Sequence, residues 1–384
     1  MLKEEQKFNR KRLKEARLIR GLTIGELADK IGVSKQAVSQ YELGENVPKS
    51  ETLLAIVSVL GFSRSFFFKD YNEQVIGNTF FRANATASKK TKEIQFYKSI
   101  LAGYIFDYLE RLIEFPKLNL PDVSAMNIED WDNESIELLA AKLREYWSLG
   151  DKPIHNIVNL MERNGIIVFN ISMDSQKVDA FCQHRQGRPF IFLGNDKQSG
   201  ARRQFDGGHE LGHDLMHRHI HNQDVLTREE FKKIESQSNR FSSAFLLPRE
   251  AFAKTVTSTT LAHFIELKHY WRVSIAAMLH RCLDLDIISE SRYTSLMKQM
   301  SAKRMRTIEP LDDVLPIPEP TVMKKSIKML LENNVKNELQ IVQEIGIPQK
   351  FIEMLCNLEE GTLIHKEAEP MLRLVVNNAT ALTT

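Results

Sequence analysis

The sequence has few cysteines, no long hydrophobic run and almost no excess of charge. Its 384 residues include only three cysteines, which are far apart and form no C-x-x-C pair. Neither a disulfide framework nor a thiolate metal site is therefore expected. No apolar stretch approaches the roughly 20 residues needed to cross a bilayer, and the charged N-terminus lacks the apolar core of a signal peptide. These absences argue against a membrane or disulfide-rich secreted protein and predict a cytoplasmic one.

Charged residues are numerous but balanced. The 52 Lys and Arg face 50 Asp and Glu, a net charge of +2, so net charge alone predicts no nucleic-acid partner. Residues 1–20, however, hold eight basic against three acidic residues. With 42% hydrophobic and 27% charged residues the composition is globular. The length predicts two or three domains.

The stretch 205–219 contains His209, Glu210 and His213 in the order H-E-x-x-H. On a helix, residues four apart lie on one face, so both imidazoles can bind one zinc ion with Glu210 beside it. Zinc in such a site needs a third protein ligand and an open position for water. The order of residues therefore predicts a hydrolytic metal site that lacks one ligand.

Three downstream residues are candidates for that ligand. His219 has the metzincin offset, but the glycine on which those enzymes turn is replaced by Met216. His217 continues the same straight helix, where three ligands would span about 12 Å, and is set aside as a ligand. Glu235 is preferred because it lies on a separate helical segment, and Asn239, four residues on, could accept a hydrogen bond from a metal-bound histidine ring. Such a set predicts Zn²⁺, although manganese, iron or cobalt would also fit.

Residues 9–68 are predicted to form five short helices. Thr23 and Glu26 form a capping box at the start of the second, and Ser34 caps the third, which Gly44 ends. This spacing is typical of a helix-turn-helix.

From Thr23 to Gly44 the sequence matches T-x-x-E-L-A-x-x-x-G-V-S-x-x-x-V-S-x-x-E-x-G without a gap, and it resembles the lambda-repressor-like or Xre family. The resemblance implies that the second helix of the motif enters the major groove of double-stranded DNA. By position, base contacts are expected from Lys35, Gln36, Ser39 and Gln40. Phosphate contacts are expected from Arg10, Arg17, Arg20, Lys49 and Ser50. The alternative is a helical bundle for dimerisation or protein binding.

Residues 130–295 resemble the ImmA/IrrE metallopeptidases. Besides the H-E-x-x-H helix, Glu235–Pro248 is similar to the family's E-x-x-A-N-x-F-A-x-x-L-L-x-P, with Ser238 and Ser242 in place of the usual alanines. The resemblance implies a zinc endopeptidase in which His209, His213 and Glu235 hold the metal and Glu210 is the catalytic base. Its substrate would be a protein, usually a helix-turn-helix repressor.

The expected fold is mainly α with a small β-sheet (α+β). Strands are predicted over Ile166–Asn170, Val178–His184 and Pro189–Leu193, with Phe190–Leu193 or Val178–Cys182 as the edge that holds an extended substrate. Residues 261–291 are predicted to form a second, trailing helix-turn-helix, which either buttresses the active site or docks the substrate. The expected order is an all-α helix-turn-helix domain at 1–68, a helical connector at 69–127, a zincin-like (gluzincin) domain at 128–300, a linker at 301–320 and a helical C-terminal region at 321–384.

Together these features predict a DNA-binding transcription regulator with zinc-dependent endopeptidase activity that is constitutive, latent or triggered. It would bind operator DNA and cleave a repressor or antitoxin, with no membrane partner and with a homodimer left open. The alternative is a non-enzymatic repressor or antitoxin that binds a partner toxin through an inactive or latent peptidase fold. The intact H-E-x-x-H favours the enzyme, because a pure binding module does not need Glu210.

Overall fold

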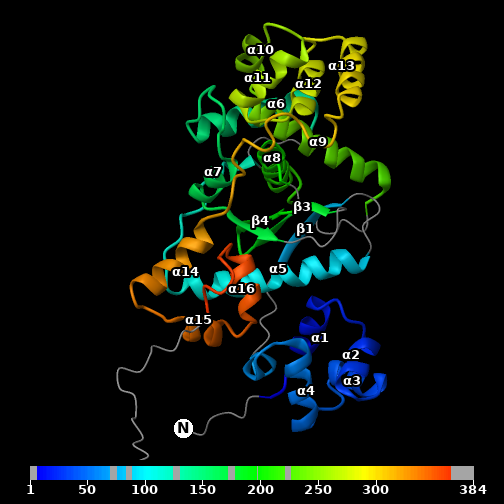
Figure 1. Ribbon diagram of the computed structural model, residues 1–384, viewed down its shortest axis with the longest axis vertical. Helices are drawn as coiled ribbons and strands as arrows, with labels where there is room; N and C mark the ends of the chain where they lie inside the picture. The colour runs from blue at the N-terminus through cyan, green and yellow to red at the C-terminus, as the bar shows by residue number, and fades with distance from the viewer. Residues whose placement is uncertain are drawn as a thin grey trace, which may run out of the picture.

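The computed structural model describes residues 7–69, 76–83, 89–123, 130–171, 178–196, 198–220 and 226–364. Its layers follow one another along the long axis (Figure 1): a helical N-terminal domain, a layer of helices, a small sheet, the helices above the sheet, and a final helical group. The mainly α fold with a small sheet is thus confirmed.

The N-terminal domain consists of α1 (Arg10–Ile19), α2 (Ile24–Ile31), α3 (Lys35–Leu43), α4 (Ser50–Leu60) and a 3-10 helix (Arg64–Phe68). The predicted capping box is present, since the Thr23 hydroxyl accepts from the Glu26 amide at 3.1 Å and the Glu26 carboxylate accepts from the Thr23 amide at 2.7 Å. Gly32 ends α2 with φ of 71°, a left-handed conformation that favours glycine. Local capping therefore sets the turn between α2 and α3.

The sheet has four strands in the order β1-β3-β4-β2. They are β1 (Ile76–Ala83), β2 (Ile167–Ile171), β3 (Val178–Arg185) and β4 (Arg188–Gly194). Strands β3 and β4 form a hairpin whose turn residues, Gln186 and Gly187, have φ of 46° and 81°, as in the mirror-image turns that suit the twist of paired strands. Strand β2 pairs with β4 in parallel.

Side chains alternate between two cores along the inner strands. On β3 and β4, Cys182, Ile191 and Leu193 point to the core under the metal-site helices, whereas Phe181, Phe190 and Phe192 point to the opposite core. That opposite face stacks phenylalanine rings, with centroids 4.5 Å apart for the pair from β3 and β4. A sheet covered on both faces requires apolar residues at every position, which explains the nearly continuous hydrophobic runs.

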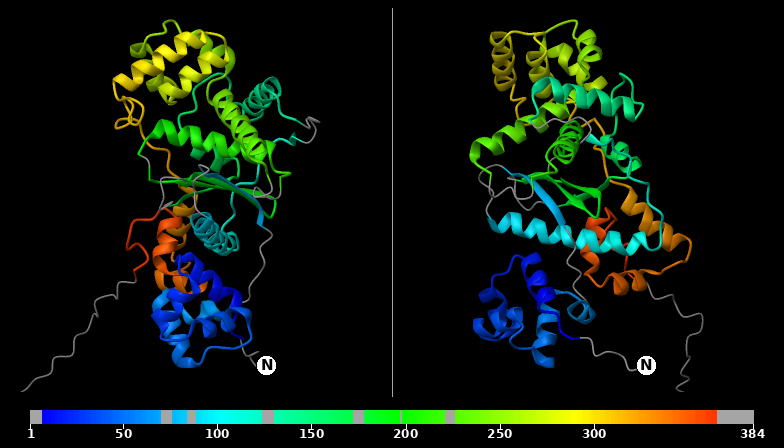
Figure 2. Two further views of the ribbon diagram at one scale, coloured as in Figure 1. Left: turned by 90° about the vertical axis from the view of Figure 1, so that its right-hand side faces the viewer. Right: turned by 180° about the vertical axis from the view of Figure 1, so that it is seen from behind.

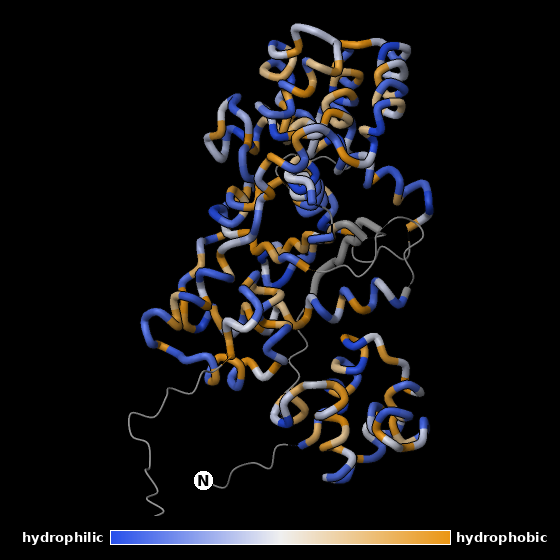
Figure 3. The backbone as a smooth tube through the Cα atoms, viewed as in Figure 1, coloured by the Kyte–Doolittle hydropathy of each residue, from blue (hydrophilic) through white to orange (hydrophobic). Residues whose placement is uncertain are grey.

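The face above the sheet carries α8 (Gly200–Met216) and then α9 (Arg228–Leu246), α6 (Asn133–Tyr146) and α7 (Ile157–Arg163). Beyond them lie α10 (Arg249–Thr255), α11 (Leu261–Trp271), α12 (Ile275–Asp284) and α13 (Glu290–Ala302). The face below carries α5 (Lys89–Glu110) together with α14 (Val322–Glu332), α15 (Glu338–Ile345) and α16 (Gln349–Leu355) (Figures 1 and 2). Hydrophobic positions occur on the helices of both faces (Figure 3).

Three parts of the chain differ from the expected organisation. Residues 76–83, expected within a helical connector, form β1, which pairs with β3. Because β1 and β2 are the outer strands, Phe190–Leu193 and Val178–Cys182 lie inside the sheet, and the expectation that either is the edge strand is wrong. The C-terminal helices, expected as an appendage, contribute Ile327, Ile341 and Leu355 to the core below the sheet.

The segment expected as a linker is held by hydrogen bonds at Glu309, and so are the residues just after its end. Glu309 accepts hydrogen bonds from the Lys268 ammonium at 2.9 Å and from the Ile275 amide at 2.8 Å. Further on, the Thr321 and Val322 amides both donate to the buried Glu162 carboxylate at 2.9 Å. These contacts connect the upper helices to the C-terminal ones. Among the described residues, no helix combines the length and apolarity needed to cross a bilayer.

Candidate metal centre

The metal-site residues come from α8 and α9, which lie unusually close together. A Cβ on Gly208 would be 2.5 Å from the Ser242 hydroxyl oxygen, and one on Gly212 would be 2.9 Å from the Phe241 ring. Glycine at these two positions lets the backbones approach. The serine that replaces the usual alanine at 242 is accommodated because its hydroxyl donates to the Phe205 carbonyl at 2.8 Å.

Three side chains converge across this contact. The Nε2 atoms of His209 and His213 are 3.0 Å apart, and the Glu235 carboxylate oxygens lie 3.1 Å from Nε2 of His213 and 3.5 Å from Nε2 of His209. Ligands at about 2.0–2.1 Å from a tetrahedral ion are roughly 3.3 Å from one another. Two histidines and one glutamate at these separations fit a single divalent cation, so the residues expected to bind zinc could hold it.

The electrostatics of the three side chains also suit a cation. Burial by itself would raise the pKa of the Glu235 carboxyl, but the interactions with His209 and His213 lower it well below its usual range. The glutamate is therefore an anion at neutral pH, beside two buried imidazoles. Asn239, on the same helix, has its Oδ1 2.9 Å from Nδ1 of His209. An amide oxygen there accepts from Nδ1–H of His209, so the lone pair that the neutral ring offers to a cation is on Nε2.

His217 makes contacts that its position in the sequence did not predict. It is buried, and its Nδ1 lies 3.1 Å from Nδ1 of His213 while its Nε2 lies 2.9 Å from Oε1 of Gln237. Burial, with a smaller contribution from His213, lowers the pKa of His217 to about 3, so the ring is neutral. His217, set aside as a ligand from the sequence, therefore contacts the expected ligand His213. The spacing of four residues between the two histidines could have indicated this contact, but nothing in the sequence indicated the contact with Gln237.

Glu210 is fully buried beside the converging ligands. Cys182 of β3 approaches it from the sheet, and the pKa of that thiol is raised well above its usual value by burial and then by the carboxylates of Glu210 and Asp214. The thiol is therefore neutral and able to donate, as expected of a buried free cysteine. Asp214 also contacts β3, with its Oδ1 3.1 Å from Nδ1 of His184.

A cavity of about 670 Å³ opens next to the metal centre. Glu235 and Asn239 lie on its wall, and α12 and α13 of the trailing helices supply the other side. The residues that line it include apolar and basic side chains, Phe205, Phe231, Met297, Lys232, Arg240 and Arg306, together with the acidic Asp284. The trailing helix-turn-helix thus both packs against the site and borders the space beside it.

The expected base-contacting residues lie on α3. Lys35 and Gln36, in its first turn, are exposed, whereas Ser39 and Gln40 are half-buried. The Gln40 amide oxygen accepts from Asn46 at 2.9 Å, which fixes that side chain. Lys49 and Ser50 are exposed at the start of α4. The first turns of α3 and α4 therefore present free polar groups.

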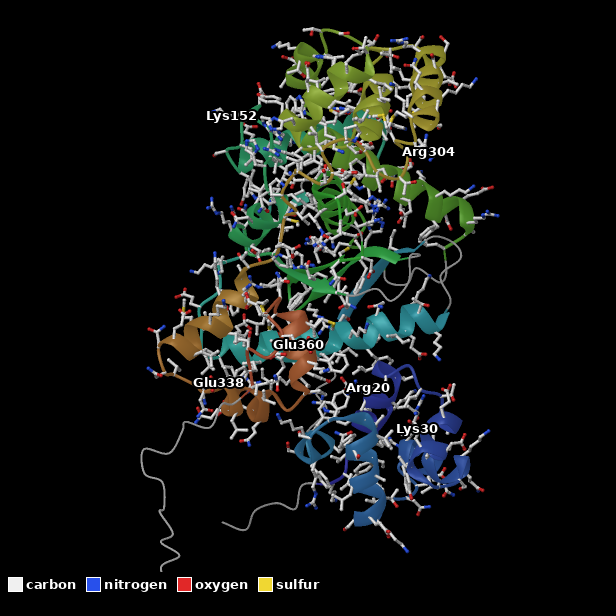
Figure 4. The ribbon with its side chains drawn as sticks, in the orientation of Figure 1. Arg20, Lys30, Lys152, Arg304, Glu338 and Glu360 are labelled. Carbon is white, nitrogen blue, oxygen red and sulfur yellow. The ribbon has the colours of Figure 1, made fainter. Side chains whose placement is uncertain are left out.

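The expected phosphate-contacting arginines are placed differently. Arg17 is buried and its guanidinium donates to both oxygens of Glu42, at 2.6 and 2.9 Å, so the expectation that it reaches a phosphate is wrong. Arg20 donates to the Leu60 carbonyl at 2.7 Å and covers the ring of Phe351 at 5.0 Å; it faces the C-terminal helices (Figure 4). Arg10 donates to the Leu43 carbonyl at the end of α3. Capping and packing contacts of this kind do not appear in a one-dimensional motif.

Comparison with known proteins gives matches for two parts of the chain. Residues 161–283 match the peptidase M78 family, described as the IrrE N-terminal-like domain, and residues 13–67 match a helix-turn-helix family. An uncharacterized HTH-type transcriptional regulator, YonR, derived from the SPbeta prophage of Bacillus subtilis strain 168, is 33% identical over 63 residues, 16% of this chain and 58% of that protein. YqaE of the same organism, also described as an uncharacterized HTH-type transcriptional regulator, is 38% identical over 64 residues, 16% and 55% respectively. The chain spans little more than half the length of these relatives.

Among solved structures, a Mycobacterium tuberculosis transcriptional regulator matches at 16% identity with a TM-score of 0.30, covering 48% of this chain and 51% of that one. The fold and the site describe a helix-turn-helix domain joined to a domain with a candidate two-histidine, one-glutamate metal centre. The family matches agree with both parts: the chain carries an N-terminal helix-turn-helix domain and an IrrE N-terminal-like domain, as the two resemblances predicted.

Proposed function

We propose that the protein is a DNA-binding transcription regulator with a zinc-dependent endopeptidase activity directed at a protein substrate, a repressor or an antitoxin. The observation that carries the peptidase part is the convergence of His209, His213 and Glu235 next to Glu210. A site built only to bind a partner protein would have no use for three converging ligand side chains with the carboxylate of Glu210 buried beside them. The match to a peptidase family over 161–283 supports the same class.

In this proposal each residue has a separate task. His209, His213 and Glu235 hold the zinc ion, and Asn239 orients His209. When bound, the ion would polarise the substrate carbonyl and make a nearby water more acidic. Glu210 takes a proton from the water whose oxygen adds to the carbonyl carbon, and it returns that proton to the amine that leaves as the C–N bond breaks. No oxidant, reductant or further reactant is required.

The substrate segment would enter through the cavity between α9 and the trailing helices. This space of about 670 Å³ reaches Glu235 and is large enough for one or two side chains. Its exposed Lys232 and Arg306, near Met297 and Phe231, favour a segment that combines acidic and apolar residues. Polar groups on α3 and α4 would meanwhile bind DNA, which places the peptidase near the repressor bound at an operator.

The test compares the zinc-loaded full-length protein with its Glu210→Gln variant. Both should retain one zinc per chain by elemental analysis, because Glu210 is not a ligand in the proposal. Only the wild type should shorten one of the helix-turn-helix proteins encoded beside it, seen by immunoblot, and induce the genes which that protein represses. Cleavage at equal rates by both proteins would contradict the role of Glu210.

A second candidate is a non-enzymatic repressor or antitoxin that uses the same fold to bind a partner toxin. The complete burial of Glu210 favours it, since a general base must meet water and substrate. Under this hypothesis, Glu210→Gln leaves every regulatory readout unchanged, and the wild type binds zinc without cutting any candidate. The same pair of proteins therefore separates the two functions.

A further inference from the structure

We propose that His217 is a positioning residue that orients His213 for metal binding through the hydrogen-bonded chain His213, His217, Gln237 and the Trp131 carbonyl. The inference rests on the metal site of the proposed function and adds a residue that neither the H-E-x-x-H motif nor the third ligand includes. All four residues of this hydrogen-bonded series are buried. They come from α8 and the residue that caps its C-terminus, from α9, and from the segment before α6.

The donor and acceptor roles in this series of hydrogen bonds are set by its last member, the Trp131 carbonyl. A backbone carbonyl can only accept, so the Gln237 amide nitrogen, 2.7 Å from the Trp131 oxygen, must be the donor. The other end of the same amide is therefore its oxygen, which can only accept. That oxygen faces Nε2 of His217 at 2.9 Å, and this nitrogen must carry the proton.

The same logic passes through the buried ring to the ligand. A neutral imidazole that is protonated on Nε2 has a lone pair on Nδ1. Nδ1 of His217 therefore accepts from Nδ1 of His213, 3.1 Å away, with the Ser238 hydroxyl 3.5 Å distant as a weaker neighbour. Nδ1 of His213 then holds a proton, and its Nε2, the atom that faces His209 and Glu235, presents the lone pair that a metal requires.

The two histidine ligands are thus oriented by amides of one helix, by different routes. Asn239 contacts His209 directly, whereas Gln237 acts on His213 through the ring of His217. Residues that orient metal-bound histidines typically change metal affinity by 10–100-fold when removed. A residue that only filled space would change the stability of the fold without selecting a tautomer.

Two variants of the full-length protein test this role, His217→Phe and Gln237→Leu. The first keeps an aromatic ring but removes both nitrogens; the second leaves His217 in place and removes the acceptor that fixes its proton. Zinc affinity is measured on the metal-free protein by competition with a fluorescent chelator, and the ligand field by the visible spectrum of the Co²⁺-loaded protein. Asn239→Leu is the positive control, and His219→Phe, at an exposed histidine two residues away, is the negative control.

Both variants should bind zinc 10–100-fold more weakly than wild type and show a shifted Co²⁺ spectrum, as Asn239→Leu should. His219→Phe should match wild type within about twofold. If both variants bind like wild type while Asn239→Leu is weakened, the positioning role is refuted. If wild type itself does not bind zinc, the proposed metal site is wrong, and not only the positioning role of His217.

A measurement on the unchanged protein covers the case in which a variant fails to fold. Long-range proton–nitrogen spectra of histidine-labelled wild type distinguish the two neutral tautomers and the charged ring. We expect the metal-free protein to show His217 protonated on Nε2 and His213 protonated on Nδ1. A His217 ring protonated on Nδ1, or on both nitrogens at neutral pH, would overturn the proposal.

Discussion

The molecule contains two helix-turn-helix units of nearly the same local design, α2–α3 and α11–α12, in opposite environments. Each second helix begins at a serine whose hydroxyl accepts from the amide three residues on: Ser34 from Ala37 at 3.1 Å, and Ser274 from Ala277 at 3.2 Å. Both first helices end in a left-handed residue, Gly32 in one and Arg272 in the other. Local sequence specifies the motif equally well in both places.

The environments of the second helices differ. On α3 only Val38 is buried, and the first turn is open to solvent. On α12, Ile275, Met278, Leu279, Arg281 and Cys282 are buried, and the free amides of its first turn are bound by Glu309 of the segment that follows α13. In the N-terminal domain, α1 is the helix that packs against α5, and α3 lies on the side of the domain away from α5 (Figure 1). The packing around a motif, and not the motif itself, therefore decides whether its second helix can enter a DNA groove.

The largest expected effect is on the buried unit, from Glu309→Ala. Lys268 is completely buried, and without Glu309 its one remaining ion-pair partner among the described residues is Asp312, at 2.7 Å, while two amides of α12 lose their acceptor. Breaking a buried ion pair from one side costs about 3–5 kcal/mol. We expect the free energy of unfolding in urea to fall by that amount, with faster amide hydrogen exchange in α12.

Asp313→Ala is the matched control, because this carboxylate is exposed on the same segment. It should change the free energy of unfolding by less than about 0.5 kcal/mol. Equal effects of the two substitutions would mean that Glu309 does not hold the trailing unit, and the contrast between the two units would lose its cause.

The next effect concerns the contact between α1 of the N-terminal domain and α5. Glu15 of α1 is buried and receives a hydrogen bond from Tyr104 of α5 at 3.2 Å. Burial, opposed by Arg12, raises its pKa from 4.5 to about 7. Because the folded state binds the Glu15 proton more tightly than the unfolded state does, protonation stabilises the fold. This contribution to the free energy of unfolding is fully present below pH 4.5 and is lost as the pH rises through 7. The change amounts to at most about 3 kcal/mol.

Urea unfolding of wild type and Glu15→Gln from pH 4.5 to 8 checks this. The difference in unfolding free energy between the two proteins should change across this range, to the disadvantage of wild type at high pH. Glu51→Gln, at an exposed carboxylate of α4, should run parallel to wild type. A constant difference between wild type and Glu15→Gln would show that the α1–α5 contact does not titrate.

What the sequence predicts well here is local in the chain. The H-E-x-x-H spacing and the capping box at Thr23 each depend on residues within a few positions, and the structure shows both of them. The helical period also sufficed to bring Glu235 and Asn239 to the histidines, because one face of α9 meets one face of α8.

What the sequence does not predict depends on distant partners. Strand β1 lies about 100 residues from β3, and pairing between strands is decided by the partner rather than by the strand's own pattern. Arg17 looks like a phosphate contact until Glu42, 25 residues away, is seen to bind it. His217 gains a role only when Gln237 and Trp131 stand at the end of its hydrogen-bond chain.

A smaller effect tests the exposed unit. Gln36→Ala removes an amide that could bind a base edge, and a lost contact of this type costs about 1–3 kcal/mol, or roughly 10–100-fold in affinity. The probe is a labelled DNA duplex selected by wild type from a random library, and binding is followed by fluorescence anisotropy. His280→Ala, an exposed side chain on α12, should leave DNA affinity unchanged. If His280→Ala weakens binding as much as Gln36→Ala, the trailing unit also contacts DNA.

The smallest effect compares the two serine caps directly. Removing a serine N-cap typically costs about 1 kcal/mol. Ser34→Ala should cost that much, because among the described residues no other side chain accepts from the amides in the first turn of α3. Ser274→Ala should cost roughly half as much, since Glu309 still accepts from the Ile275 and Ala276 amides. Amide hydrogen exchange in α3 and α12 measures the two costs in the same molecule. Only Ser34→Ala should also weaken DNA binding, because α3 must keep its first turn to reach the bases. Equal costs at the two caps would show that Glu309 does not share the capping of α12.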